Sequence, residues 1–204
     1  MIISSINQKG GSGKSTIAVN LAALAASNGM ATAIIDLDPQ ATACAWIRSR
    51  EAEDIKLVVT HPPEILSMVK SLRKEGVELI IIDTPPHNST AAANAVNVSD
   101  LCLIPVRPSA FDLNAAEATI QLIQANNGKG VFVLNSVPAS TNVLNSASEF
   151  IESTGFKVIA KVGQRMAYQH AVAIGLGVTE YEPNSKAAGE IIELWNALRE
   201  FTNV

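Results

Sequence analysis

The chain has 204 residues, 48% of them hydrophobic, and a formal net charge of −4 at pH 7. A chain of this size can bury one sizeable core and leaves little sequence for a second, so we expect a single domain over residues 1–204. The two cysteines lack a CxxC spacing, which argues against a disulfide framework, a zinc site or an iron–sulfur site, and the net acidity argues against broad nucleic-acid affinity in a monomer.

No apolar run reaches the ~20 residues that a bilayer-spanning helix needs. The first predicted strand begins at Ile2. We therefore expect neither a signal peptide nor a helix-turn-helix extension before it, and a cytoplasmic protein.

The first predicted strand, residues 2–6, runs into a glycine-rich loop that opens a helix at 14–28. Glycines let the backbone N–H groups curl around a phosphate, and the helix N-terminus favours an anion. Lys14 can reach the β- and γ-phosphates of a nucleotide, and the Ser15 hydroxyl can bind Mg²⁺. The predicted phosphate-binding residues are Gly10, Gly11, Ser12, Gly13, Lys14, Ser15 and Thr16.

The second predicted strand, residues 31–37, ends in two carboxylates, Asp36 and Asp38. Ligands of open α/β sheets bind at the carboxyl edge, and buried carboxylates are costly unless they are paired, hydrogen-bonded or beside a metal. Two interpretations stay open for each aspartate. It serves a ligand site, or it caps the helix predicted at 41–50.

A strand at 57–60 and an amphipathic helix at 63–74 are predicted next. The apolar side chains of that helix recur at helical spacing and are expected to face the core. They are Ile65, Leu66, Val69 and Leu72.

Residues 78–83, ELIIID, predict a further buried strand that ends in Asp83. After a phosphate-binding loop, an aspartate in this place fits a Walker B residue that holds Mg²⁺ directly or through water. The alternative is an aspartate that merely closes a strand.

The second half of the chain continues the alternation of helix and strand that a parallel α/β sheet requires. Strands are expected at 101–106, 130–135 and 157–160, the last at the edge of the sheet, and helices at 89–98, 113–125, 141–153 and 184–201. We expect Asp112 to cap the helix at 113–125.

The closing helix is expected to bury Ala188, Ile191, Ile192, Trp195 and Leu198. Its polar face carries more glutamates than basic residues, unlike that of a helix that targets a membrane surface. We therefore expect no membrane partner.

The glycine loop departs from the plain phosphate-loop pattern, because Gln8 stands where that pattern has glycine, and a further lysine, Lys9, precedes Lys14 by five residues. In this KGGSGKS form the chain resembles the deviant Walker A ATPases of the ParA/MinD family. The segments DLDPQ at 36–40 and DTPP at 83–86 are similar to later motifs of that family. The resemblance implies a single doubly wound, mostly parallel α/β domain, with strand 2–6 central and strand 78–83 beside it.

The resemblance also implies roles for the residues around the phosphates of ATP. Lys9 would reach across a dimer to the nucleotide of the partner subunit. Asp38 would orient or activate the attacking water, and Asp36 would support a Mg²⁺ site formed with Ser15 and Asp83.

On the base side, the resemblance implies that the segment holding Pro105 and Arg107 lines the nucleotide base and flanks the dimer face. It assigns adenine recognition to Asn135, whose amide can both donate and accept hydrogen bonds. The alternative is an asparagine that starts a turn before residues 137–138.

The implied function is that of a Mg²⁺-dependent ATPase with slow basal turnover that forms a nucleotide-sandwich homodimer. Such a dimer would bind nucleoid DNA without sequence preference and partition plasmid or chromosomal DNA with a centromere-binding adaptor protein. The alternative is a ParA-like positioning ATPase for a protein cargo, either a carboxysome or a chemoreceptor cluster. A metal-cluster carrier would need paired cysteines, and a ligase of the dethiobiotin synthetase type would not need Lys9, so both are disfavoured.

For DNA, we expect the contacts in the C-terminal half, at Lys157, Lys161 and Arg165. Of the three, Arg165 alone lies in a segment similar to the family. The alternative is that all three are ordinary solvated charges around an edge strand.

Overall fold

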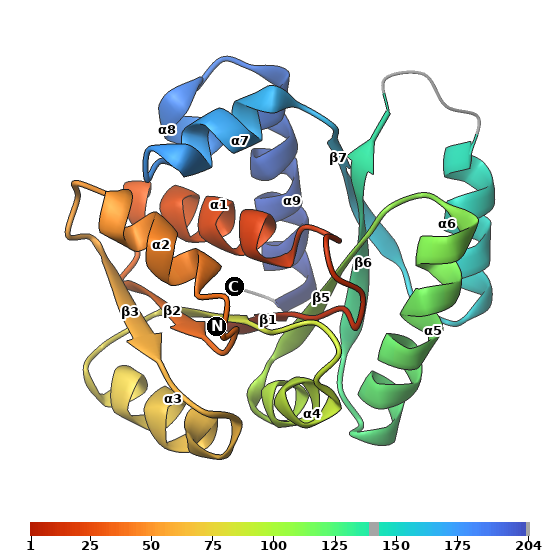
Figure 1. Cartoon of the computed structure of the whole chain (residues 1–204), viewed down its shortest axis with the longest axis horizontal. Coiled ribbons are helices and arrows are strands. Elements are labelled where there is room, and N and C mark those ends of the chain that lie inside the picture. The colour runs from red at the N-terminus through yellow and green to blue at the C-terminus, as the bar shows by residue number, and fades with distance from the viewer. Residues whose placement is uncertain (139–142, 203–204) are drawn as a thin grey trace.

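One parallel sheet forms the middle of the molecule (Figure 1). The computed structural model describes residues 1–138 and 143–202. The strands are β1 (Ile2–Ser5), β2 (Thr32–Asp36), β3 (Ile55–Val59), β4 (Leu79–Asp83), β5 (Leu101–Val106), β6 (Gly130–Val137) and β7 (Val158–Gly163). Their order is β3-β2-β4-β1-β5-β6-β7, and each pairing is parallel. The doubly wound α/β fold is confirmed, with β1 central, β4 beside it and β7 at the edge.

Helices cover both faces of this sheet (Figure 1). On one face lie α1 (Lys14–Ser27), α2 (Thr42–Ser49), α7 (Met166–Ala173), α8 (Val178–Tyr181) and α9 (Lys186–Thr202). On the other face lie α3 (Ile65–Lys74), which follows a short 3-10 turn at Pro62–Glu64, α4 (Ser89–Val98), α5 (Ala110–Ala125) and α6 (Val143–Ser153). None of the helices within 1–138 and 143–202 is long and apolar enough to cross a membrane.

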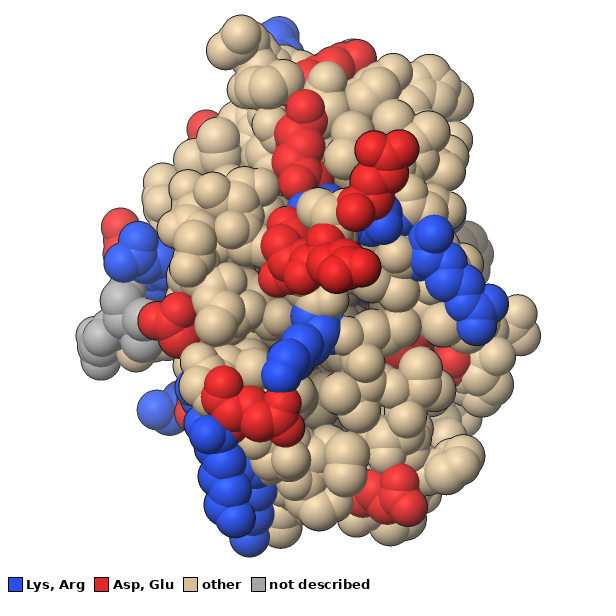
Figure 2. All heavy atoms as spheres, turned by 90° about the vertical axis from the view of Figure 1, so that its left-hand side faces the viewer, with Lys and Arg blue, Asp and Glu red and all other residues tan. Residues whose placement is uncertain are grey.

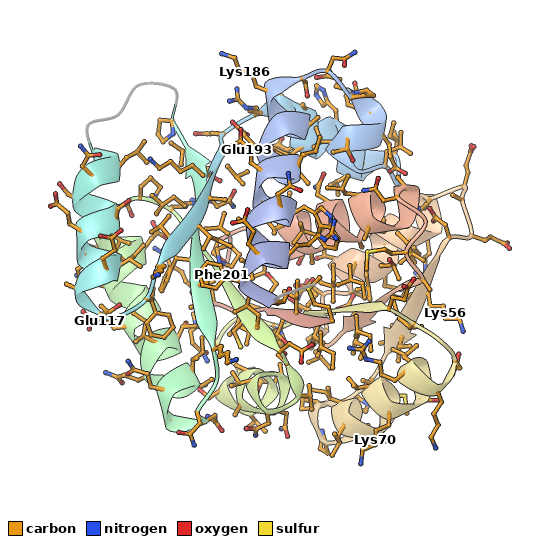
Figure 3. The ribbon with its side chains drawn as sticks, turned by 180° about the vertical axis from the view of Figure 1, so that it is seen from behind. Lys56, Lys70, Glu117, Lys186, Glu193 and Phe201 are labelled. Atoms are coloured by element: carbon orange, nitrogen blue, oxygen red, sulfur yellow. The ribbon has the colours of Figure 1, made fainter. Side chains whose placement is uncertain are left out.

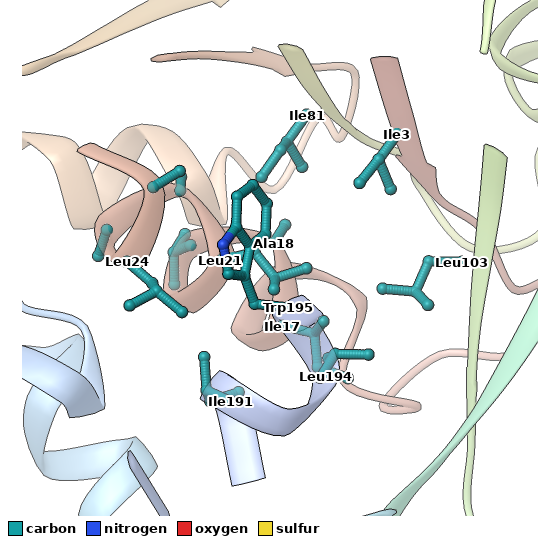
Figure 4. Close-up of a cluster of buried hydrophobic side chains, with 14 of the residues drawn as sticks. Ile3, Ile17, Ala18, Leu21, Leu24, Ile81, Leu103, Ile191, Leu194 and Trp195 are labelled. Carbon is teal, nitrogen blue, oxygen red and sulfur yellow. The ribbon is translucent and has the colours of Figure 1, made fainter. Parts of the chain in front are cut away.

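Two hydrophobic cores lie on the two faces of the sheet, because successive side chains of a strand point in opposite directions. Ile3 and Ile81 belong to the core under α1, whereas Ile2 and Ile80 belong to the core over α3 to α6. Figure 4 shows the first of these cores, where strand side chains meet those of α1 and α9, with Trp195 among them. Full burial of such side chains contributes roughly 1.5–3 kcal/mol each.

Helix α1 is buried along most of its length because it lies between the sheet and the layer of α8 and α9. Its residues Ile17, Leu21 and Leu24 are buried as predicted, and Gly29 follows its end at φ 81°, where glycine has no steric penalty. The loop before α1 is therefore attached to one of the most enclosed helices of the molecule.

Several predicted boundaries and facings are wrong. Leu66 is 52% exposed and Ile192 is 40% exposed, although helical spacing predicted both to be buried. Strand β3 begins at Ile55 rather than at 57, and β6 extends to Val137 rather than ending at 135. The predicted helix start at 141 lies outside the described residues.

The start of α5 is also corrected. The helix begins at Ala110 and its N-cap is Ser109, whose hydroxyl accepts a hydrogen bond from the Asp112 N–H at 3.2 Å. Asp112 therefore stands in the first turn instead of capping the helix. A carboxylate there is favoured by the positive end of the helix dipole.

Candidate functional site

The glycine loop between β1 and α1 turns at two glycines that have left-handed backbone conformations. Gly11 and Gly13 adopt φ values of 70° and 98°. A Cβ atom built on Gly13 would lie 2.0 Å from the Asn135 amide nitrogen, so no larger residue fits there. That amide donates to the Ser12 carbonyl at 2.7 Å, which holds the loop against the end of β6.

The first half of the loop is held by neighbouring elements. The Asn7 amide donates to the Pro105 carbonyl at 2.7 Å and accepts from the Lys9 N–H at 2.8 Å. The Gln8 N–H donates to the Thr119 hydroxyl of α5 at 3.2 Å. The loop is thus braced from β5 and α5 before any ligand binds.

Lys14 is only 6% exposed and donates to the Lys9 carbonyl at 3.3 Å. Burial lowers the pKa of its ammonium group, and the carboxylates of Asp83 and Asp38 oppose that effect. The nearby Ser12 hydroxyl is buried and has no hydrogen-bond partner among the described residues. A buried cation beside unpaired donors fits the phosphates of a nucleotide.

Asp36 and Asp83 are direct neighbours across β2 and β4 at the carboxyl edge of the sheet. Asp83 is fully buried, and within the described parts of the chain neither of its carboxylate oxygens has a partner with hydrogen-bond geometry. Desolvation raises the pKa of Asp83 to about 7, although the nearby Ser15 hydroxyl and Lys14 act in the opposite direction. A fully buried carboxylate next to a hydroxyl fits a magnesium site.

That site would not be an all-protein cage. No group of three or more His, Cys, Asp or Glu residues suited to a metal ion is found within residues 1–138 and 143–202. Mg²⁺ commonly uses one or two carboxylates together with substrate phosphates and water. The residues present fit this mode, in which Ser15 and Asp83 would be the protein ligands.

Asp36 serves the local fold in addition to any ligand role. Its carboxylate accepts from the Asp38 N–H at 2.9 Å and from the Cys44 N–H in the first turn of α2 at 3.1 Å. Burial raises the pKa of Asp36, and these two hydrogen bonds oppose the rise. Asp38 is half-buried and accepts from the Gln40 N–H at 2.9 Å, and its charge acts on Lys14 and Asp83.

Lys9 lies on the rim of the loop and pairs with a residue of its own subunit. Its ammonium group is 2.7 Å from a carboxylate oxygen of Asp112, and its side chain is 36% exposed. Desolvation acts to raise the pKa of Asp112, but Lys9 and the Ser109 hydroxyl hold it below its usual range. The sequence did not predict this ion pair, because Asp112 was interpreted as a helix cap.

A cleft of about 250 Å³ opens beside the loop. Gly11, Gly13 and Thr16 line one side, and residues at the junction of β7 and α7 line the other. Asn135 and Arg107 are among the lining residues, where the base of a nucleotide was predicted to lie. Pro105 is buried within β5 and supports the loop through its carbonyl, and its predicted contact with the nucleotide stays a prediction.

The three cations predicted to form one DNA-binding cluster are separated. Arg165 follows β7 at the carboxyl edge, where it lines the cleft and pairs with Glu190 of α9. Lys157 precedes the same strand at its other end, roughly 25 Å away at the usual rise of a strand. Lys157 and Lys161 are exposed. The three cations therefore lie spaced along one strand, with Arg165 paired to Glu190, and their contact with DNA stays a prediction.

Comparison with known proteins gives one family match and full-length relatives. The family model described as the CobQ/CobB/MinD/ParA nucleotide binding domain matches residues 3–184. The "Maintenance of carboxysome distribution protein A" of Halothiobacillus neapolitanus is 29% identical over 93% of this chain and 92% of its own. The "Sporulation initiation inhibitor protein Soj" of Bacillus subtilis is 25% identical over 95% and 96%.

Solved structures show the same fold. The septum site-determining protein MinD of Pyrococcus horikoshii, complexed with Mg-ADP, superposes with a TM-score of 0.79 at 18% identity, and the match covers 97% of this chain and 95% of that chain.

Proposed function

This chain belongs to the CobQ/CobB/MinD/ParA nucleotide-binding family and is a ParA/MinD-type P-loop ATPase, and from this premise we propose that it acts as a DNA-partition ATPase. In this proposal a single domain over residues 1–204 binds ATP with Mg²⁺, forms a nucleotide-sandwich homodimer and binds nucleoid DNA without sequence preference. It moves plasmid or chromosomal DNA in the cytoplasm with a centromere-binding adaptor protein. The observation that carries the proposal is that Lys9 lies beside a loop that buries Lys14 near the fully buried carboxylate of Asp83.

Each part of the site has a role in this proposal. Residues 10–16 hold the phosphates through backbone N–H groups, and Lys14 adds a mobile charge at the β- and γ-phosphates. Ser15 and Asp83 hold Mg²⁺, and Asp36 keeps the Asp38 loop and α2 in place next to them. Bound Mg²⁺ would neutralise charge on the phosphate oxygens.

In this proposal Asp38 orients the attacking water. Its carboxylate is half-exposed, and one oxygen holds the Gln40 N–H, so the group keeps a defined orientation while it can still accept a hydrogen bond. Arg107 and Asn135 border the cleft in which we place the base and ribose.

The proposed dimer can be tested through Lys9. Wild-type protein with a non-hydrolysable ATP analogue should sediment as a dimer, whereas Lys9→Ala should bind the analogue and stay monomeric, because two triphosphates that face each other repel without that charge. Lys70→Ala, which removes an exposed lysine of α3 (Figure 3), is the matched control and should dimerise normally. If Lys9→Ala dimerises as well as wild type, Lys9 does not act on the nucleotide of the partner subunit, and this part of the proposal is wrong.

A second candidate function is the positioning of a protein cargo. The Halothiobacillus relative is named for carboxysome distribution and matches almost its whole length to this chain. The partner protein encoded by the neighbouring gene distinguishes the two functions. A small basic DNA-binding protein that stimulates hydrolysis supports DNA partition, whereas a stimulating partner without DNA affinity supports cargo positioning.

A further inference from the structure

Glu190 of α9 accepts several hydrogen bonds from the end of β7, the start of α7 and the segment that joins them. Its carboxylate accepts from the Gly163 N–H at 3.0 Å, from the Arg165 Nε at 3.1 Å and from the Tyr168 hydroxyl at 2.9 Å. A fourth bond, from Arg165 Nη2, makes the contact with Arg165 two-pronged. One carboxylate thus holds three successive parts of this segment.

The same segment forms one wall of the cleft beside the glycine loop. Gly163, Gln164, Arg165 and Tyr168 all line that cleft, opposite Gly11 and Gly13. Glu190 itself is only 17% exposed at its side chain and is followed by Ile191, which is buried in the core against α1. The wall is therefore held at a set distance from the loop through α9.

The chemistry of the wall suits a planar ligand. The fork of Arg165 is occupied at Nε and Nη2, so the plane of its guanidinium group is held by Glu190. A guanidinium plane of defined orientation can stack on an aromatic base. Tyr168 is held as well, and burial raises the pKa of its hydroxyl well above the usual range, so it stays a hydrogen-bond donor.

We propose that Glu190 is a positioning residue for the nucleobase: by holding Arg165 and the β7–α7 segment it sets the wall against which the base of the bound nucleotide lies. The proposal rests on the proposed function, because it requires the phosphates to occupy the glycine loop. It gives α9, which has no residue in the phosphate site, a part in nucleotide affinity.

The test compares ATP with inorganic triphosphate, which has the phosphates but no base. Glu190→Gln keeps the size of the side chain and removes the charge that holds the Arg165 fork. We expect about tenfold weaker ATP binding by calorimetry and a change of less than about twofold for triphosphate. Glu193→Gln, an exposed glutamate of the same helix (Figure 3), is the control and should leave both affinities unchanged.

Equal losses for both ligands, or unchanged ATP affinity, would overturn the proposal. If Glu190→Gln does not fold, Arg165→Lys keeps the positive charge but loses the fork, and it should show the same loss for ATP alone. Failure of the proposed function looks different, because wild-type protein would then bind neither ATP nor triphosphate.

Discussion

Lys9 has two possible partners, and only one of them belongs to its own subunit. In the proposed dimer its ammonium group must leave Asp112 before it can reach the opposing nucleotide. A partly exposed ion pair of this kind contributes at most about 1 kcal/mol. Asp112 therefore holds Lys9 weakly, as a contact that a triphosphate can displace.

Asp112→Asn should make dimerisation easier. We expect the half-maximal concentration of a non-hydrolysable ATP analogue for dimer formation to fall about two- to fivefold, since the competing carboxylate is removed. Light scattering measures the dimer. Glu117→Gln, on the exposed side of the same helix (Figure 3), should behave as wild type. A weaker dimer in Asp112→Asn would mean that Asp112 instead orients Lys9 for the interface.

Asp38→Ala should bind ATP and hydrolyse it slowly. Orientation of the water acts only in the transition state, and loss of such a group typically lowers the rate ~10²–10⁴-fold. The dimer formed with ATP should then last longer than that of wild type in a sedimentation time course. Normal turnover in this variant would assign Asp38 to the turn that it forms with Gln40.

Asp83 makes the stability of the nucleotide-free protein depend on pH. Desolvation raises its folded pKa to about 7, above its unfolded value, so the folded state binds the extra proton and stability falls as pH rises towards 7. Asp83→Asn should be more stable than wild type at pH 8, by about 1 kcal/mol or more, and this gain should shrink towards pH 5. Urea unfolding in EDTA at the two pH values measures it, and a gain that does not vary with pH would refute the buried charge.

At the scale of elements, α2 is fastened at both ends. Asp36 holds its first turn, and beyond its last residue Arg50 bonds to Asp54 and to Glu180 of α8, each at 2.7 Å. The Arg50 side chain is 1% exposed, and its guanidinium group lies 5.2 Å from the Trp46 ring centroid. This anchor ties the helix that follows the proposed water-orienting residue to the α8 layer.

Arg50→Met should lower the free energy of unfolding by about 2–4 kcal/mol, because it leaves the half-buried Glu180 without its cation. Arg50→Lys should recover only part of this, since an ammonium group cannot form the fork. Arg48→Met, at an exposed position of α2, should change stability by less than about 0.5 kcal/mol. Denaturant titration of the three variants is the measurement, and equal effects at the two arginines would contradict the anchor.

The elements show where sequence patterns suffice. Continuous apolar runs predicted β4 and β5 almost to the residue, because both faces of these strands are buried and only polar residues can end them. Helix facing was predicted less well, since Leu66 and Ile192 satisfy helical spacing yet lie at the margin of the buried stripe. The spacing of apolar residues predicts which side of a helix is buried, but it does not predict how wide the buried stripe is.

At the scale of the whole molecule, contacts between distant segments limited the prediction of the site. Motif spacing predicted where the glycine loop, Asp36 and Asp83 lie, because each stands at the carboxyl end of a strand and parallel strands end at one edge of the sheet. The partners of Lys9 and Arg165 come from α5 and α9, at positions that no motif marks. Only the folded chain shows these two pairs.

The distribution of acidic and basic side chains over the surface is also a property of the whole molecule. Figure 2 shows the face that carries α8, β3 and α3, where acidic and basic side chains are mixed and no continuous basic field is formed. On this face Lys56 pairs with Glu75 at 2.5 Å. DNA contact by the proposed dimer is better placed at the opposite edge, where Lys157 and Lys161 are exposed beside β7.

We therefore expect the proposed dimer to bind DNA only when ATP is present. Its affinity for DNA should fall steeply as the salt concentration rises. One phosphate contact contributes about 0.9 to the slope of log affinity against log salt, so Lys161→Ala, which removes two contacts per dimer, should lower the slope by up to about 2. Mobility shifts on unrelated duplexes with ATP, ADP or no nucleotide measure this, and Lys70→Ala is the control. Tight binding with ADP, or none with ATP at low salt, would remove DNA from the proposed function.

The central place of β1 has a consequence for synthesis of the chain. Its hydrogen-bonded neighbours are β4 and β5, and Ile2 pairs with Ile80 while Ile3 pairs with Leu101. As the ribosome delivers the chain, the apolar residues of β1 and α1 must wait for β4 and β5, at residues 79–83 and 101–106, before the two sides of that strand can be paired. During this interval the nascent chain exposes this apolar segment, which favours binding by chaperones until β5 has emerged.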